Sequence, residues 1–227
     1  MAILFDDAAS ERMTVASAPV TASPLTMACW FRTDVLTIAE TMMSLDNSGN
    51  GSEQIELRVQ GNVGGDPVRF ISRSGSGNGI ADSTATPSAN TWAHACGVLT
   101  AANSRAAFLN GANKGTDSTS SVPSGLDSLT IGATDNGGSP TRFWSDRIAE
   151  AAIWNVGLSD GEVAVLAKGF SPLLIRPESL VFYLPMIRLG QSNVQYDHIG
   201  GLALTEVNTP AAAGHPPSII YPAFIDG

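Results

Sequence analysis

Charge is what this 227-residue chain has least of. Only 15% of its residues are charged, and 21 acidic side chains stand against 12 lysines and arginines, giving a formal net charge of −9. Folded proteins carry about 25% charged residues on average. The basic residues are scattered, and only Lys114 and Lys168 are lysines. Because phosphate binding needs clustered basic side chains, we expect no nucleic acid among the partners.

Cysteine and long apolar runs are scarce as well. The two cysteines, Cys29 and Cys96, lie inside apolar segments, which favours buried thiols over a disulfide framework. No apolar run reaches the roughly 18 residues of a transmembrane helix, so we expect no membrane partner. The first seven residues have no basic side chain before the apolar stretch and end on two acids, unlike a secretory signal.

Short strand-like segments between turn residues are abundant. The chain has 23 glycines and 13 prolines, many of them between apolar runs. Eleven strands are predicted, at 2–5, 11–16, 25–33, 41–45, 54–60, 68–73, 92–100, 105–109, 129–133, 146–154 and 180–186. Many short strands with turn signals between them predict an all-β sandwich or barrel, and a sandwich of this length forms a single unit.

Segment 54–60 alternates with the period of two that a strand requires. Ile55, Leu57 and Val59 share one face, and the polar residues between them, including Glu56 and Arg58, take the other. We therefore expect only the apolar face to be buried. Glu56 and Arg58 are expected on a solvated surface.

Two glycine-containing segments predict different structures. The strand at 105–109 leads into Asn110-Gly111, a dipeptide that tolerates the positive φ angles of a tight hairpin turn. Segment 75–79 is rich in glycine but lacks the lysine and following helix of a phosphate-binding loop. We expect a hairpin at the first segment and a flexible loop at the second.

One helix is predicted near the end of the domain. Ser159 and Glu162 have the spacing of a capping box, and Val163 and Leu166 begin a short apolar stripe. Gly169 marks the end of the helix. About two and a half turns are too few to be stable alone, so we expect the helix to pack against the sheet.

The character of the chain changes after residue 208. Prolines become frequent between residues 209 and 222, which excludes a helix and favours extended geometry. We divide the chain into a domain at 1–208 and an extended C-terminal arm at 209–227, which docks on its own domain or on a neighbour. The apolar residues expected to make that contact are Ile219, Ile220, Tyr221 and Phe224.

Four stretches follow one another in an informative order. They are LTMACWFR at 25–32, NTWAHACGV at 90–98 with the hairpin strand after it, LTIG at 129–132, and DRIAEAAIWN at 146–155 running on to Gly169. This order, over roughly residues 1–208, resembles the laminin-G-like, concanavalin A-type jelly-roll family. The resemblance implies an all-β, two-sheet antiparallel jelly-roll sandwich with one short helix. Such folds host lectins, adhesion modules, glycosidases and virion proteins.

The acidic residues do not form the pairs that glycoside hydrolysis requires. Retaining glycosidases hold two carboxylates about 5 Å apart. Glu53 and Glu56 lack the central acid of the family's glucanases, and Asp146 and Glu150, four residues apart in a strand, would lie about 13 Å apart. His94 lies in an apolar strand, which favours a core histidine over a catalytic base. We predict no enzyme activity and no catalytic residues.

Calcium is a cofactor that the resemblance implies. Laminin-G-like domains often hold Ca²⁺ at the rim of the sandwich, using an Asp after one strand and an Asp or Asn from a second loop. Asp46 and the pair Asp135-Asn136 fall at comparable places, and calcium prefers oxygen ligands. The alternative is that these residues serve only as turn formers.

A carbohydrate site would need an exposed aromatic ring beside polar groups. Arg142 and Trp144, together with Asn136 of the preceding loop, are the candidate ligand-binding residues. The alternative is that Phe143 and Trp144 begin the following strand and that one of them belongs to the core.

Two functions follow as expectations. The N-terminus without a secretory signal and the proline-rich arm resemble laminin-G-like proteins encoded by tailed bacteriophages. This implies a non-enzymatic protein of the virion, a capsid decoration or tail-fibre element that contacts other virion proteins, further copies of itself and host-surface glycans. The alternative is a Ca²⁺-dependent, carbohydrate-binding lectin module.

Overall fold

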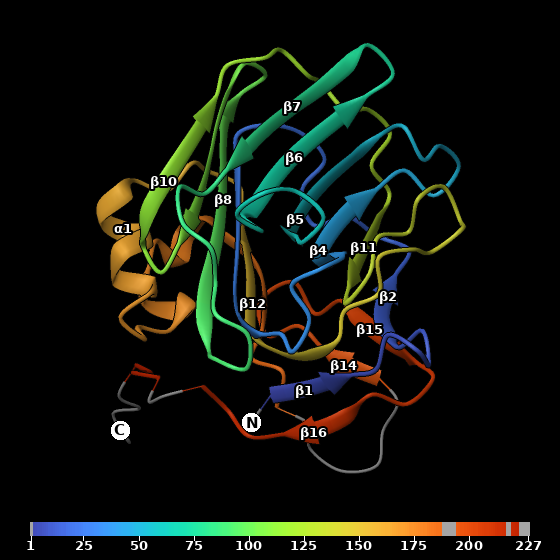
Figure 1. Ribbon diagram of the computed structural model, residues 1–227, viewed down its shortest axis with the longest axis vertical. Helices are drawn as coiled ribbons and strands as arrows, with labels where there is room; N and C mark the ends of the chain where they lie inside the picture. The colour runs from blue at the N-terminus through green and yellow to red at the C-terminus, as the bar shows by residue number, and fades with distance from the viewer. Residues whose placement is uncertain (1, 188–193, 217–218, 223–227) are drawn as a thin grey trace.

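Two antiparallel sheets of eight strands face each other in the computed structural model, which describes residues 2–187, 194–216 and 219–222 (Figure 1). The first sheet has the order β10 (Ala112–Asp117), β9 (Ser104–Leu109), β8 (Ala93–Ala101), β3 (Leu25–Arg32), β12 (Asp146–Trp154), β1 (Ala2–Phe5) and β16 (Ala211–Ala213), and β13 (Leu180–Leu184) also pairs with β12. The second has the order β14 (Val194–Tyr196), β15 (Ala203–Val207), β2 (Arg12–Val15), β11 (Ser128–Ile131), β4 (Ala39–Asp46), β5 (Gln54–Gln60), β6 (Val68–Ser74) and β7 (Gly77–Asp82). The predicted jelly-roll sandwich is confirmed.

The main hydrophobic core fills the space between the two sheets. Alternation along β3 and β5 directs Met27, Phe31 and Leu57 into it, and all three are fully buried. The sheets approach closely where Phe70 of β6 lies over Gly97 of β8, because a Cβ atom at Gly97 would clash with that ring. Cys29 and Cys96 are buried free thiols, as predicted.

The helix α1 (Asp160–Leu166) begins with the predicted capping box. The Glu162 amide donates to the Ser159 hydroxyl at 3.4 Å, and the Ser159 amide donates to the Glu162 carboxylate at 2.7 Å. Val163 and Leu166 pack on the outer face of the first sheet. Two short 3₁₀ turns follow, η1 (Pro172–Leu174) and η2 (Pro177–Ser179). Among the described residues no helix is long and apolar enough to cross a membrane.

The two glycine-containing segments have different outcomes. Asn110 and Gly111 both have positive φ, +54° and +70°, and join β9 to β10 in the predicted hairpin. The prediction of a flexible loop at 75–79 is wrong for the second half of that segment, because β7 begins at Gly77 and pairs with β6. Backbone pairing with a neighbouring strand orders a segment that has no apolar alternation. The absence of a Cβ atom at Gly79 makes room for the Arg105 guanidinium, with which a Cβ atom would collide.

The C-terminal segment packs on its own chain. Ala211–Ala213 form β16, which extends the first sheet beside β1. Further along, the Ile220 amide donates to the Gly169 carbonyl at 2.7 Å, and the Tyr221 hydroxyl donates to Glu150 at 2.7 Å. Ile219 is half-buried, and Phe224 lies outside the described residues. Docking of this segment on a partner protein stays a prediction.

Candidate functional site

The outer surface of the second sheet carries an ordered array of polar side chains. Strand register sets three rows across β4, β5 and β6: Asp46, Gln54 and Arg73; Ser44, Glu56 and Ile71; Thr41, Arg58 and Arg69. We call these nine residues the polar face. Because side chains alternate along a strand, the residues between them point into the core.

Glu56 and Arg58 are buried in this array, so their expected place on a solvated surface is wrong. Glu56 is 0% exposed and Arg58 is 5% exposed. Arg58 donates to Glu56 at 3.0 Å and the Thr41 hydroxyl donates to the same carboxylate oxygen at 3.2 Å. Burial lowers the pKa of Arg58, and the charge of Glu56 opposes that shift. The pair is buried because neighbouring polar side chains and the loop before β12 cover it.

That loop, residues 132–145, lies over the end of the polar face. The Thr41 amide donates to the Arg142 carbonyl at 2.9 Å, and the Gln54 side-chain amide donates to Asn136 at 3.4 Å. The Asp135 amide donates to the Asp46 carboxylate at 3.3 Å. The structure therefore brings together four of the residues predicted from the sequence, Asp46, Asp135, Asn136 and Arg142.

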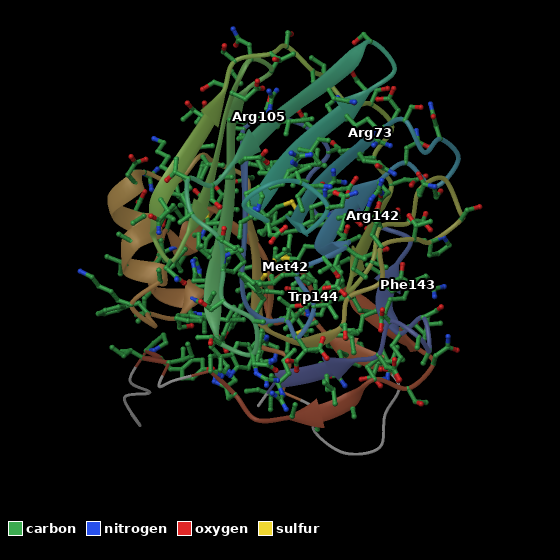
Figure 2. The ribbon with its side chains drawn as sticks, in the orientation of Figure 1. Met42, Arg73, Arg105, Arg142, Phe143 and Trp144 are labelled. Atoms are coloured by element: carbon green, nitrogen blue, oxygen red, sulfur yellow. The ribbon has the colours of Figure 1, made fainter. Side chains whose placement is uncertain are left out.

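Trp144, the fifth residue predicted at this site, is instead buried in the main core; Figure 2 labels it near Phe143. Its ring is 0% exposed and packs edge-on against Phe31 in the core, with 5.7 Å between the ring centroids. A ring without exposed surface cannot stack on a sugar. The prediction that Trp144 is a ligand-binding residue is therefore wrong. Its neighbour Phe143 is half-buried beside the Arg12 guanidinium.

The surroundings of Asp46 do not fit a calcium ion as they are arranged. Thr134 donates to one carboxylate oxygen at 2.9 Å, and Ser44 and the Asp135 amide donate to the other at 2.5 and 3.3 Å. Burial raises the pKa of Asp46 to about 6. Within residues 2–187, 194–216 and 219–222 there is no group of three or more Asp, Glu, His or Cys side chains that could hold a metal ion. Calcium binding at Asp46 and Asp135 stays a prediction.

Several buried polar atoms of β5 and β6 lack a hydrogen-bond partner within the described part of the chain. They are Gln54 Oε1, Glu56 Oε1, Arg58 Nε, Gln60 Oε1 and Arg73 Nε. An unpaired buried polar atom costs about 1–3 kcal/mol, and most such atoms in proteins are satisfied by protein or water. These donors and acceptors lie next to one another on one surface. They could bind a ligand with many hydroxyl groups, because each hydroxyl both donates and accepts.

The sequence analysis missed Gln54, Glu56, Arg58 and Arg73 as site residues. The available signal was the polar half of the alternating segment 54–60, which carries opposite charges two residues apart. That pattern is also typical of an ordinary solvated strand. The loop that buries the pair comes from about 80 residues further along the chain, so the pattern alone could not separate the two cases.

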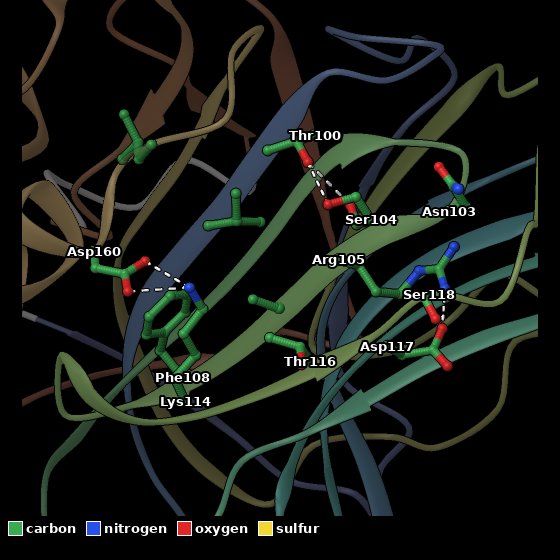
Figure 3. Close-up of a pocket in the computed structure, with 13 residues that line it drawn as sticks. Thr100, Asn103, Ser104, Arg105, Phe108, Lys114, Thr116, Asp117, Ser118 and Asp160 are labelled. Atoms are coloured by element: carbon green, nitrogen blue, oxygen red, sulfur yellow. Dashed lines mark hydrogen bonds and ion pairs between the residues drawn. The ribbon is translucent and has the colours of Figure 1, made fainter.

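A depression of about 440 Å³ lies on the first sheet between β8, β9, β10 and the start of α1 (Figure 3). Lys114 and Asp160 form an ion pair across it at 2.8 Å. The Lys114 ammonium lies 5.4 Å from the centre of the Phe108 ring, which is itself only 2% exposed. Lys114, Asp160 and Phe108 thus contact one another here, while Arg105, which also lines the depression, has a buried Nε without a partner among the described residues.

The carboxylates considered for catalysis are each bound to partners of their own. Asp146 pairs with Arg32. Glu150 sits in a bulge of β12 with φ of +54° and accepts hydrogen bonds from Tyr183, Tyr221 and, at 3.1 Å, the His215 ring. In this structure Glu150 is therefore an anchor for the C-terminal segment.

His94 belongs to the buried part of the first sheet, as predicted. It is 2% exposed, and its ring packs edge-on against Trp30 with 5.5 Å between the centroids. Burial lowers the pKa of His94 to about 3, so the ring is neutral near pH 7.

A sandwich of two eight-stranded antiparallel sheets, with one outer surface covered by a helix and the other polar, defines a lectin-like jelly-roll domain. The pattern of the concanavalin A-like lectin/glucanases superfamily matches residues 7–164. The chain belongs to that superfamily. A search of curated proteins gives no match.

Solved structures with the same fold include carbohydrate-binding proteins. A Bacteroides ovatus protein assigned to carbohydrate binding shares 17% identity with a TM-score of 0.62, covering 93% of this chain. The chain spans 61% of the length of that protein. The CBM40 of Ruminococcus gnavus IT-sialidase, bound to α2,3-sialyllactose, shares 18% identity with a TM-score of 0.57 over 65% of this chain and 84% of the other.

An SAP-like pentraxin from Limulus polyphemus is also similar. It shares 15% identity with a TM-score of 0.58, covering 73% of this chain and 81% of the pentraxin. At these identities the likeness shows the fold alone, and the ligand of this chain has to be argued from its own residues.

Proposed function

We propose that this protein is a non-enzymatic carbohydrate-binding module and that its polar face takes the glycan. The observation that carries the proposal is the group of unpaired buried polar atoms on β5 and β6, from Gln54 to Gln60 and at Arg73. Sugar hydroxyls would supply the donors and acceptors that these atoms lack, and the side chains that cover the atoms have to move to admit the sugar. The fold supports the proposal, because structures of the same architecture include modules that bind carbohydrate.

A glycan array with two matched variants tests this proposal. Gln54→Leu removes the amide from the middle strand of the polar face while keeping a side chain of similar size. Asn103→Leu makes the same type of change in the depression of Figure 3. We expect Gln54→Leu to weaken glycan binding at least tenfold and Asn103→Leu to leave it unchanged. Absence of any bound glycan, or equal binding by Gln54→Leu and wild type, contradicts the proposal.

Calcium dependence belongs to the same set of experiments. Because both Asp46 oxygens already accept hydrogen bonds, a bound ion would have to replace Ser44, Thr134 or the Asp135 amide. Glycan binding in EDTA and in millimolar Ca²⁺ distinguishes the two cases. Loss of binding in EDTA that Asp46→Ala reproduces would support a Ca²⁺-dependent lectin.

The virion role predicted from the sequence is compatible with carbohydrate binding, since a virion protein can contact host-surface glycans. Mass spectrometry of purified particles tests it directly, and particles without this protein contradict it. Removing residues 209–227 tests the arm: lost assembly with an intact fold would support partner docking.

A further inference from the structure

The polar face gathers positive charge although the chain as a whole is acidic. Arg58, Arg69 and Arg73 come from its strands, and Arg142 from the loop that covers its end. Two of them are neutralised locally. Arg58 pairs with the buried Glu56 at 3.0 Å, and Arg69 forms two parallel hydrogen bonds with Asp82 of β7, at 2.6 and 2.7 Å.

The other two guanidinium groups keep unused hydrogen-bonding capacity. Among the described residues, the Arg73 guanidinium has no hydrogen-bond or ion-pair partner, and its Nε is buried. Arg142 forms a long ion pair with Glu56, with 3.9 Å between the nearest nitrogen and oxygen, which is beyond hydrogen-bond distance. Its side chain remains 27% exposed. Both groups can therefore donate to a ligand from solvent.

The strand register places these two arginines on either side of the same pair of acceptors. Arg73 lies directly opposite Gln54 on the neighbouring strand, and Arg142 approaches Glu56, two residues further along β5. Figure 2 shows both over the β4–β6 part of the sheet. Strands lie about 4.8 Å apart and rise about 6.8 Å over two residues, so the two positions are separated by about 8 Å. A mono- or disaccharide spans that distance.

The backbone at Arg142 is held in a conformation that costs free energy. Its φ is +54°, in the left-handed region, where a residue with a Cβ atom is disfavoured by about 1–2 kcal/mol. The hydrogen bond from Thr41 to the Arg142 carbonyl and the bridge between Thr134 and Thr141 maintain it. Strain of this kind is concentrated at binding sites, where the surrounding structure imposes it.

We infer that the polar face recognises an acidic glycan, a sugar that carries a carboxylate or a sulfate group. The acidic group pairs with Arg73 or Arg142, and the sugar ring reaches the other guanidinium group. Guanidinium groups match carboxylate and sulfate oxygens with paired, charge-assisted hydrogen bonds. A net charge of −9 disfavours unspecific attraction of an anion, so this recognition is local. The inference rests on the proposed function.

Matched pairs of glycans that differ only in the acidic group test the inference. The probes are sialyllactose against lactose, oligogalacturonate against its methyl ester, and heparin oligosaccharide against its desulfated form. We expect at least one acidic member to bind, at least tenfold tighter than its neutral counterpart. The pairs that respond show whether the group is a carboxylate or a sulfate.

Three arginine variants assign the binding to the site. Arg73→Gln and Arg142→Gln are each expected to weaken binding of the acidic glycan about tenfold or more, with little effect on a neutral one. Arg176→Gln removes the same charge from an exposed pair with Glu162 near α1, and serves as the matched control. Circular dichroism checks that all three are folded.

The possible outcomes separate this inference from the proposed function. Glycan binding without preference for the acidic member, or an equal loss in Arg176→Gln and Arg73→Gln, overturns the acidic-glycan inference and leaves carbohydrate binding in place. If no glycan on the array or among these pairs binds, the proposed function fails as well.

Discussion

The outer surfaces of the two sheets are built in opposite ways. On the first sheet, Phe108, Trp154 and their apolar neighbours are covered by α1 and the turns after it, and they form a second hydrophobic cluster. On the second sheet, the polar face carries charged and amide side chains, several with unpaired atoms. The chain thus covers one surface with its own helix, where His94 Nδ1 and Arg147 Nε are scattered unpaired atoms among the described residues, and on the other it groups several such atoms on the neighbouring strands β5 and β6.

The difference follows from how each kind of surface is stabilised. Burial of apolar area contributes about 25 cal/mol per Å² with no requirement for direction, so a short helix is enough to cover the first sheet. Polar atoms need partners at fixed positions, and each one buried without a partner costs about 1–3 kcal/mol. A ligand that supplies those partners gains free energy on the second sheet and has nothing comparable to gain on the covered part of the first.

Truncating Trp154 should have the largest effect on stability and none on binding. This side chain is 0% exposed, and its indole NH donates to the Ile175 carbonyl at 2.7 Å. We expect Trp154→Ala to lower the free energy of unfolding by about 3–5 kcal/mol, because it leaves a cavity under α1 and the turns after it. Urea unfolding measures the loss. Half-buried Leu173, in the same cluster, is the milder control as Leu173→Ala.

If Trp154→Ala abolished glycan binding while the protein stayed folded, this result would contradict the separation of the covered surface from the glycan-binding surface. Affinity should therefore be measured well below the unfolding midpoint of the variant.

Breaking the buried Glu56–Arg58 ion pair of the second sheet should lower the free energy of unfolding almost as much. Glu56→Gln leaves the Arg58 charge buried without its partner, which we expect to cost about 3 kcal/mol and to weaken glycan binding. Asp160→Asn breaks an exposed pair with Lys114 and should cost less than about 1 kcal/mol.

A double replacement sharpens this prediction. Glu56→Met combined with Arg58→Leu removes both charges and should recover much of the stability, because no charge is left buried alone. Glycan binding should not recover with it. Recovery of both would mean that the pair has no role in recognition.

Stability should depend on pH through β4, which belongs to the second sheet. Burial, above all, raises the pKa of Glu40 to about 8 and that of Asp46 to about 6. Each folded-state pKa lies above the unfolded value, so their contribution is complete below about pH 4 and is lost as the pH rises to 8.

Glu40→Gln isolates that effect, because a neutral amide can keep the contacts that Glu40 makes with Thr33 and the Ser145 amide. We expect the wild type to lose about 4 kcal/mol relative to the variant between pH 4.5 and 8.5. Unfolding curves across that range measure it. Parallel pH profiles for the two proteins would show that Glu40 does not titrate in this way.

Removing the helix cap should have the smallest effect. Ser159→Ala deletes the hydroxyl that accepts from the Glu162 amide and should cost about 1 kcal/mol, whereas Ser159→Gly should cost only a few tenths. Thermal unfolding compares the two variants. Glycan binding should be unchanged in both, since the cap serves only the covered surface.

Most of the fold could be predicted from local sequence patterns. The hairpin at Asn110-Gly111, the capping box of α1 and the alternation in β5 depend on residues within a few positions of one another. Strands without an apolar pattern, such as β7, β10 and β16, were missed because pairing with a neighbouring strand, not composition, makes them strands.

The candidate site could be predicted only in part. Asp46, Asp135, Asn136 and Arg142 were predicted as residues of loops and strand ends, and the structure places them together. Trp144 was assigned to the site because the sequence has no means of showing which of two adjacent aromatic rings points inward. The burial of Glu56 and Arg58 depends on a loop distant in sequence.

The sequence by itself determined the class of fold, because the period of strands, turns and caps is a local property of the chain. Only the tertiary structure decided which outer surface is covered by the helix and which one groups unpaired polar atoms. That decision depends on contacts between distant segments, such as Thr41 with Arg142 and Gln54 with Asn136. The acidic excess of the chain had favoured a solvated outer surface. The structure instead buries Glu56 there and leaves two arginines beside it without a hydrogen-bonded partner among the described residues.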